Sequence, residues 1–114
     1  MARIINETKG TVVAEDVRFA DGIWSRFWGL MGRKSIPGDS GLLLRPSSSI
    51  HTAFMRFPLD IVFLDRQLRV VKIVAGMKPF RATIAFSGAH SALELNAGMA
   101  GRAEVQAGDQ LALE

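Results

Sequence analysis

Short apolar runs separated by turn-forming residues dominate the pattern of this chain. The runs are rich in Val, Ile, Leu and Phe, and Gly, Pro, Asp or Ser stand between them, which is typical of β-strands joined by tight turns. The strands that this pattern predicts lie at residues 11–19, 42–44, 50–56, 60–64, 68–75, 82–86, 89–95 and 110–113. Residues 97–106, rich in Ala and Gly, are expected to form a turn or one helical turn.

One segment follows a helical period instead. Trp24, Phe27, Trp28 and Met31 repeat at the i, i+3, i+4, i+7 spacing of one helical face, which predicts a short amphipathic helix near residues 22–32. An aromatic face of this kind can offer a stacking platform, but it more often packs against a sheet. We therefore interpret it as a helix that covers a sheet.

These elements together predict the fold class. With 114 residues the chain has the length of a single domain, residues 1–114, that is large enough to bury a core. Many short strands and one helix indicate an α+β fold, with a mostly antiparallel β-sheet curled toward a small barrel. No repeat or linker divides the chain.

Composition removes several classes of function. The chain has no Cys, which excludes thiol redox chemistry, disulfides and Cys-based zinc sites, and its two His residues offer little for a metal. We therefore expect no metal site and no cofactor. No apolar segment is long enough to span a bilayer or to act as a signal peptide, which predicts a cytoplasmic protein, or an exported one if a leader was removed.

The net charge of +3 is unevenly spread. Residues 17–56 hold six bases and two acids, whereas residues 82–114 hold one base and four acids. A basic N-terminal half of this kind fits a nucleic-acid-associated protein. The alternative is a solvated surface on which Arg stems cover apolar area, and we favour it because no basic run is interleaved with stacking aromatics.

Several short motifs, in a fixed order, carry a family resemblance. They are Arg-Phe-Trp-Gly-Leu-Met-Gly-Arg at 26–33, Gly-Leu-Leu-Leu at 41–44, His-Thr at 51–52, Met-Arg-Phe-Pro-Leu-Asp at 55–60, Phe-Leu-Asp at 63–65, Leu-Glu-Leu-Asn-Ala-Gly at 93–98 and Gly-Asp at 108–109. Together they resemble the domain of unknown function 192 family over residues of about 14–113. The resemblance implies a compact, mostly β domain of bacterial or archaeal type, with no established substrate and no catalytic residue to carry over. Because this chain has the His-Thr form of the central strand, a role held by Asn there in other members does not transfer.

The stretch 49–65 places polar residues in otherwise apolar strands. His51 fits a ligand contact or a general base at neutral pH, or a structural His that holds a neighbouring loop. Arg56 and Asp60 flank a proline bend and are expected to form a structural ion pair; the alternative is that Arg56 binds an anion while Asp60 orients it. Asp60 and Asp65 fall on opposite faces of a regular strand, so they cannot act as a facing acid/base pair.

Glu94 and Asn96 share one face of a predicted strand. If His51 and Arg56 join them across the sheet, the four residues form a polar cleft suited to a hydroxylated or anionic small molecule. The alternative is that Glu94 and Asn96 simply lie on the wet face of the sheet.

Three functions follow from these residues. The first is a non-catalytic accessory module that binds a small molecule or a protein partner through His51, Arg56, Glu94 and Asn96. The second is a small hydrolase that uses His51 as base, which is disfavoured because the adjacent hydroxyl of Thr52 points to the other face. The third is the nucleic-acid-associated protein described above.

Overall fold

Strands make up most of the fold. The computed structural model describes residues 2–21, 38–45, 49–51, 57–78, 82–84 and 88–114. Within these residues the strands are β1 (Ala2–Asn6), β2 (Thr11–Asp21), β3 (Ser40–Arg45), β4 (Ser49–His51), β5 (Leu59–Leu64), β6 (Val70–Met77), β7 (Ala82–Ile84), β8 (Ser91–Asn96) and β9 (Leu111–Leu113), with the short helix α2 (Met99–Arg102). The helix predicted near residues 22–32 lies outside the described residues.

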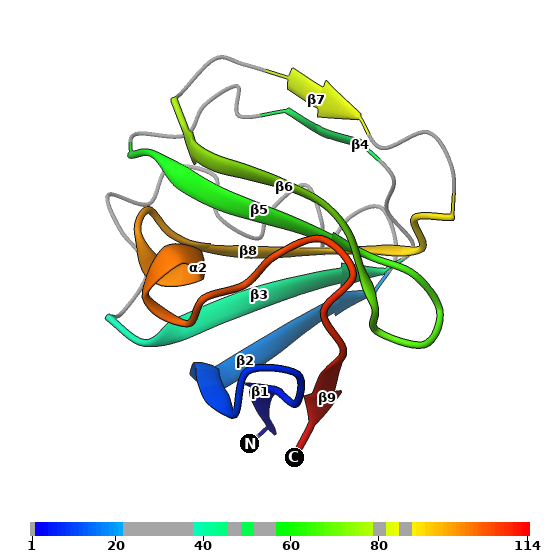
Figure 1. The fold of residues 1–114 in the computed structure, drawn as a ribbon. Coiled ribbons are helices and arrows are strands. Elements are labelled where there is room, and N and C mark those ends of the chain that lie inside the picture. The colour runs from blue at the N-terminus through cyan, green and yellow to red at the C-terminus, as the bar shows by residue number, and fades with distance from the viewer. Residues whose placement is uncertain (1, 22–37, 46–48, 52–56, 79–81, 85–87) are drawn as a thin grey trace.

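One large sheet organises these strands. Its order is β6-β5-β8-β3-β2-β1-β9, and the small pair β4–β7 is separate from it (Figure 1). Every pairing is antiparallel except that of β2 with β3, which is parallel. A parallel pair needs a long connection, and residues 22–39 supply one. The predicted mostly antiparallel sheet is confirmed.

The two edge strands of this sheet, β6 and β9, meet at one end, so the sheet curls as predicted. Arg69, just before β6, forms an antiparallel bridge with Gln110, just before β9. The N–H of Val70 donates to the carbonyl of Asp109 at 2.9 Å, and the N–H of Leu111 donates to the carbonyl of Leu68 at 3.0 Å. The result is a partly closed barrel.

Apolar side chains pack on both faces of the sheet, and each face forms its own cluster. The inner cluster fills the barrel and comprises Ile4, Val13, Ala14, Val17, Leu43, Val62, Leu64, Val70, Leu93, Leu95, Met99, Ala100, Ala103, Val105 and Leu111. The outer cluster lies on the other face and comprises Leu42, Leu44, Phe57, Leu59, Ile61, Phe63, Met77 and Ala92. Because β5 contributes to both clusters, all its residues are buried, and all but Asp60 are apolar.

The helix α2 follows directly on β8 and packs against β2, β5 and β8. In Figure 1 it lies at the left, beside the end of β8. Its Met99 and Ala100 are buried in the inner cluster. This helical turn falls inside residues 97–106, where a turn or one helical turn was predicted.

Candidate functional site

Glu94 is a carboxylate on an apolar face. It lies in β8 between Leu42 of β3 and Ile61 of β5, which are its partners in the sheet. Paired residues of neighbouring strands share a face, so the Glu94 side chain projects from the same face as the outer cluster. Glu94 is only 7% exposed.

Burial changes the acidity of this carboxyl. Desolvation raises the pKa of Glu94 from 4.5 to about 7, because the charged form loses water. None of the described residues donates a hydrogen bond to its side chain. At neutral pH the group therefore divides between the acid, which donates a hydrogen bond, and the carboxylate, which accepts one.

Three further polar residues lie on the same face, next to Glu94 and its partners along the strands. Asp16 of β2 pairs with Ser40 of β3, and Asn96 of β8 pairs with Leu59 of the outer cluster. Ser40 is buried, and one carboxylate oxygen of Asp16, Oδ1, is buried without a hydrogen-bond partner. We call Asp16, Ser40, Glu94 and Asn96 the outer-face polar group.

The structure places Glu94 and Asn96 on one face, as the alternation predicts. Asn96 Nδ2 donates to the carbonyl of Gly38 at 3.3 Å, so this amide is also tied to the turn just before β3. His51 is described only by its backbone, which pairs with Ala82. Arg56 lies outside the described residues. The four-residue cleft therefore stays a prediction, as do the roles of His51 and Arg56.

Asp60 has a structural role that the sequence did not reveal. It is 1% exposed, and it pairs with Leu95, whose side chain belongs to the inner cluster. Its Oδ1 accepts the N–H of Gly76 at 2.8 Å, and its Oδ2 accepts the N–H groups of Gly98 and Ala100, both at 3.0 Å. Asp60 thus ties β5 to β6 and to the start of α2. Its expected pairing with Arg56 stays a prediction.

Asp65 also serves the backbone. Its Oδ1 accepts the N–H groups of Gln67 and Arg69, both at 2.9 Å, and so fixes the turn between β5 and β6. Asp60 and Asp65 therefore act at different places, in line with the expectation that they do not form a facing pair.

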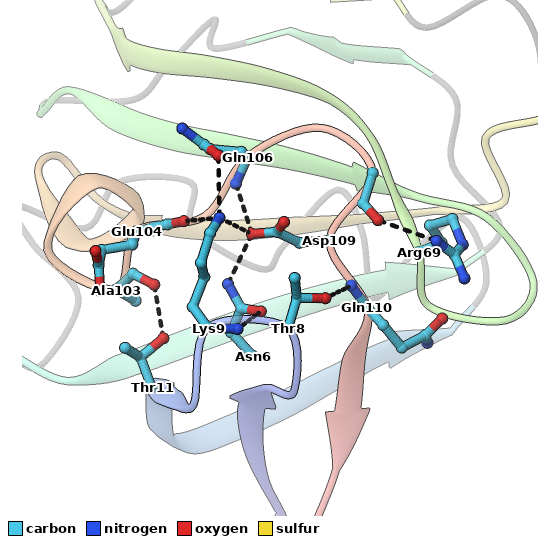
Figure 2. A network of polar contacts seen from close by, with 11 residues as sticks. Asn6, Thr8, Lys9, Thr11, Arg69, Ala103, Glu104, Gln106, Asp109 and Gln110 are labelled. Atoms are coloured by element: carbon cyan, nitrogen blue, oxygen red, sulfur yellow. Dashed lines mark hydrogen bonds and ion pairs between the residues drawn. The ribbon is translucent and has the colours of Figure 1, made fainter.

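A second polar cluster joins the β1–β2 turn to the segment before β9 (Figure 2). Asp109 Oδ2 accepts from Lys9 Nζ at 2.9 Å, from Asn6 Nδ2 at 2.9 Å and from the N–H of Gln106 at 3.0 Å. These hydrogen bonds, that of Lys9 first, lower the pKa of Asp109. Lys9 Nζ also donates to the carbonyl of Glu104 and to Gln106 Oε1, both at 3.0 Å. Since three acceptors surround the ammonium group, the cluster is a structural clasp; only Gly108-Asp109 hinted at it in the sequence.

The described residues contain neither a metal-binding cluster nor a membrane-spanning helix. They contain no group of three or more His, Asp or Glu side chains placed to hold a metal ion. Of the helices among them, none has the length and apolar character needed to cross a membrane.

Comparison with known proteins identifies the family. The DUF192 family model, described as "Uncharacterized ACR", matches residues 4–113. This chain belongs to that family. The UPF0127 protein PF1050 of Pyrococcus furiosus is 34% identical over 95% of each chain. DUF192 is an uncharacterised family, and membership assigns no substrate or reaction.

Two crystal structures share the fold of this DUF192 protein. A protein of unknown function from Novosphingobium aromaticivorans has a TM-score of 0.82 at 23% identity, covering 97% of this chain and 82% of that one. A candidate transcription regulator from Sinorhizobium meliloti has a TM-score of 0.80 at 28% identity, covering 97% and 90%. The first likeness shows the fold alone.

Proposed function

We propose that this protein is a small-molecule-binding module whose ligand contacts the outer-face polar group, with Glu94 at its centre. The observation that carries the proposal is the burial of Glu94 among Leu42 and Ile61, without a donor from any described residue. Convergent polar groups on an otherwise apolar surface are typical of small-molecule sites.

Among the described residues, no hydrogen-bond donor offsets the burial of the Glu94 carboxylate. A pKa of about 7 in place of 4.5 corresponds to a cost of roughly 3 kcal/mol for the charged form. Asp60 and Asp109 are buried too, but each accepts three hydrogen bonds from the protein. Glu94 therefore differs from the structural carboxylates, and perturbed groups of this kind concentrate at functional sites.

Binding is favoured over catalysis. Hydrolysis by the predicted mechanism requires His51 as base beside a nucleophile, and strand alternation predicts that the adjacent hydroxyl of Thr52 points to the other face. A ligand that supplies hydrogen bonds to Glu94 and Asp16 needs nothing further from the protein.

Thermal unfolding with a ligand panel tests the proposal. The panel holds sugars, polyols, nucleotides, amines and organic anions, applied to wild type, Glu94→Gln, His51→Ala and Arg56→Ala. Glu7→Gln is the matched control, because Glu7 is an exposed acid on the turn after β1. A ligand at a hundred times its dissociation constant adds about 2.7 kcal/mol, or roughly 10 °C in Tm.

We expect at least one compound to raise Tm in wild type and in Glu7→Gln, but not in Glu94→Gln. The same shift in Glu94→Gln as in wild type would contradict the proposal. Loss of binding in His51→Ala or Arg56→Ala, with the variant still folded, would add that residue to the site.

One observation favours nucleic acid as a second candidate. Phe19 of β2 is 42% exposed, and the guanidinium carbon of Arg45 lies 5.0 Å from the centre of its ring. An exposed aromatic ring beside arginine suits a stacked base, and the Sinorhizobium meliloti relative is described as a candidate transcription regulator. Binding to a short RNA or DNA would fall steeply with salt and would be lost in Phe19→Leu. No binding at low salt would remove this candidate.

A further inference from the structure

We infer that the ligand of the outer-face polar group is an organic cation, an amine carried on an alkyl body, bound between Glu94 and Asp16. The inference rests on the proposed function and names the class of its ligand. It draws on the unpartnered acceptors, on the charges around them and on their spacing.

The acceptors come first. Glu94 is buried without a donor among the described residues, and Asp16 Oδ1 is a buried atom with no hydrogen-bond partner. Both side chains project from the outer face, Glu94 from β8 and Asp16 from β2. A charged carboxylate has only acceptor sites, so the missing partner at both positions is a donor.

The surrounding charges decide between a cation and a neutral donor. The strands β3 and β5 place only uncharged residues on this face, namely Ser40, Leu42, Leu44, Leu59, Ile61 and Phe63. The other charged residues of this face on the described strands are Asp16 and Arg18 of β2, Lys72 of β6 and Arg3 of β1, whose guanidinium group forms ion pairs with Glu15 and Glu114. Arg18 is exposed and pairs with Leu42, which separates it from Glu94.

A hydroxyl group would give Glu94 a hydrogen bond but no countercharge, whereas an ammonium group gives both. An anion would add repulsion to two carboxylates. The charges on this face therefore favour a cation over the hydroxylated and anionic ligands predicted from the sequence.

Spacing then selects an organic cation over a metal ion. Asp16 and Glu94 lie on β2 and β8 with β3 between them, and adjacent strands are about 4.8 Å apart, so their backbones are roughly 10 Å or more apart. Metal ions require oxygens that converge at about 2.0–2.6 Å. The apolar side chain of Leu42 lies on the same face between the two strands, where it suits an alkyl chain.

Isothermal titration calorimetry and thermal unfolding at pH 8 test the inference with probes of one shape. The probes are 1,4-diaminobutane, 1,6-diaminohexane and 1,8-diaminooctane, the diols of the same lengths, and the matching dicarboxylates. The proteins are wild type, Glu94→Gln, Asp16→Asn and the control Glu7→Gln. The amide variants keep the shape of each side chain, and circular dichroism confirms that each one is folded.

We expect one or more diamines to bind wild type and Glu7→Gln, and to bind Glu94→Gln and Asp16→Asn at least tenfold more weakly. Binding of diols or dicarboxylates through Glu94, without binding of diamines, would overturn the cationic class and leave the proposed function standing. Diamine binding that is equal in all four proteins would overturn the inference as a non-specific charge effect. No response to any probe would overturn it as well, while a Glu94-dependent hit in the wider panel would still support the proposed function.

Discussion

At the scale of single residues, two buried carboxylates in adjacent strands behave differently because their partners differ. Asp60 faces the inner side of the sheet, where three backbone N–H groups converge on its oxygens. Glu94 faces the outer side between Leu42 and Ile61, where no described residue donates to it. Burial alone does not identify a functional acid; the supply of donors separates the two roles.

Replacing Glu94 by Gln should make the protein more stable above neutral pH. The pKa of Glu94 is about 7 in the folded protein, against an ordinary value of 4.5 that applies to the unfolded chain. Below pH 4.5 both states hold the proton. Between pH 4.5 and 7 the unfolded chain releases it first, so the free energy of unfolding falls as pH rises, by roughly 3 kcal/mol in total.

Glu94→Gln has no carboxyl group to titrate at this position. We therefore expect the difference in free energy of unfolding, in favour of Glu94→Gln over wild type, to grow from pH 4.5 to 7 and then to level off. Urea denaturation at pH 4.5, 6 and 8 measures it. The carboxylates and bases that share this face, among them Asp16, Arg18, Lys72 and the Arg3–Glu15 ion pair, are present in both proteins, so their own titration largely cancels in the difference. An advantage that does not change with pH would contradict the assignment.

Asp60→Ala should strongly destabilise the fold. The change leaves the N–H groups of Gly76, Gly98 and Ala100 without their acceptor, and two or three unsatisfied buried donors cost on the order of 3–5 kcal/mol. Asp65→Ala is the comparison, because its turn is accessible to water; we expect about 1 kcal/mol there. Equal losses in urea denaturation would mean that Asp60 does not hold β6 and α2.

At the scale of elements, irregularities in pairing explain the strand that the sequence described least well. Arg69 and Lys72 do not alternate regularly between polar and apolar positions, so no single face could be assigned to residues 68–75. The pairing of β5 with β6 contains two register shifts, between Leu59 and Ile61 and between Phe63 and Leu64. Such bulges move side chains from one face to the other, which breaks the period of two.

The clasp of Asp109 with Lys9 and Asn6 should make the protein sensitive to acid. The pKa of Asp109 is lowered from 3.8 by the hydrogen bonds of Lys9 and Asn6. An acid whose pKa is lowered by folding contributes stability at pH values above its unfolded pKa. This contribution is lost as the pH falls through the lower pKa of the folded state. We expect Asp109→Asn to be less stable than wild type at pH 7.

That difference should shrink as pH falls from about 5 toward 2, because wild type then loses the charge on Asp109. Thermal unfolding across this range measures it, and Lys9→Met should reproduce the loss at pH 7. A constant gap between wild type and Asp109→Asn at all pH values would show that the charge of Asp109 does not stabilise the clasp.

At the scale of the whole molecule, closure of the barrel joins the two ends of the chain to its middle. The strand β9 pairs with β1, and the residues just before it bridge to the start of β6. In Figure 1 both termini lie at the same side of the sheet. The strand β9 is therefore part of the sheet, and its Leu111 belongs to the inner cluster.

Leu111→Ala should test this closure. Leu111 is 1% exposed in the inner cluster, whereas Leu113, two residues later in the same strand, is 40% exposed. We expect Leu111→Ala to lower the free energy of unfolding by about 2–4 kcal/mol and Leu113→Ala by about 0.5 kcal/mol or less. Similar effects of the two changes in urea denaturation would contradict the packing of β9.

Sequence alone determined the elements that local pattern controls. Apolar runs predicted β2, β3, β5, β6, β8 and β9 close to their observed bounds, and the mostly antiparallel, curled sheet followed from their number and spacing. Alternation also placed Glu94 and Asn96 on one face. The strand β1 was missed because its short run, Ala2–Asn6, has no regular alternation of apolar and polar residues.

Only the tertiary structure decided what depends on neighbours distant in the chain. The parallel pairing of β2 with β3, the meeting of Arg69 with Gln110 and the addition of Asp16 and Ser40 to the face of Glu94 all join residues far apart in sequence. The same holds for the hydrogen-bond donors that surround Asp60, whereas no described residue donates to Glu94. The alternation of residues along a strand shows which face a side chain occupies. The pKa and the hydrogen-bond partners of that side chain depend on which strands lie beside its own.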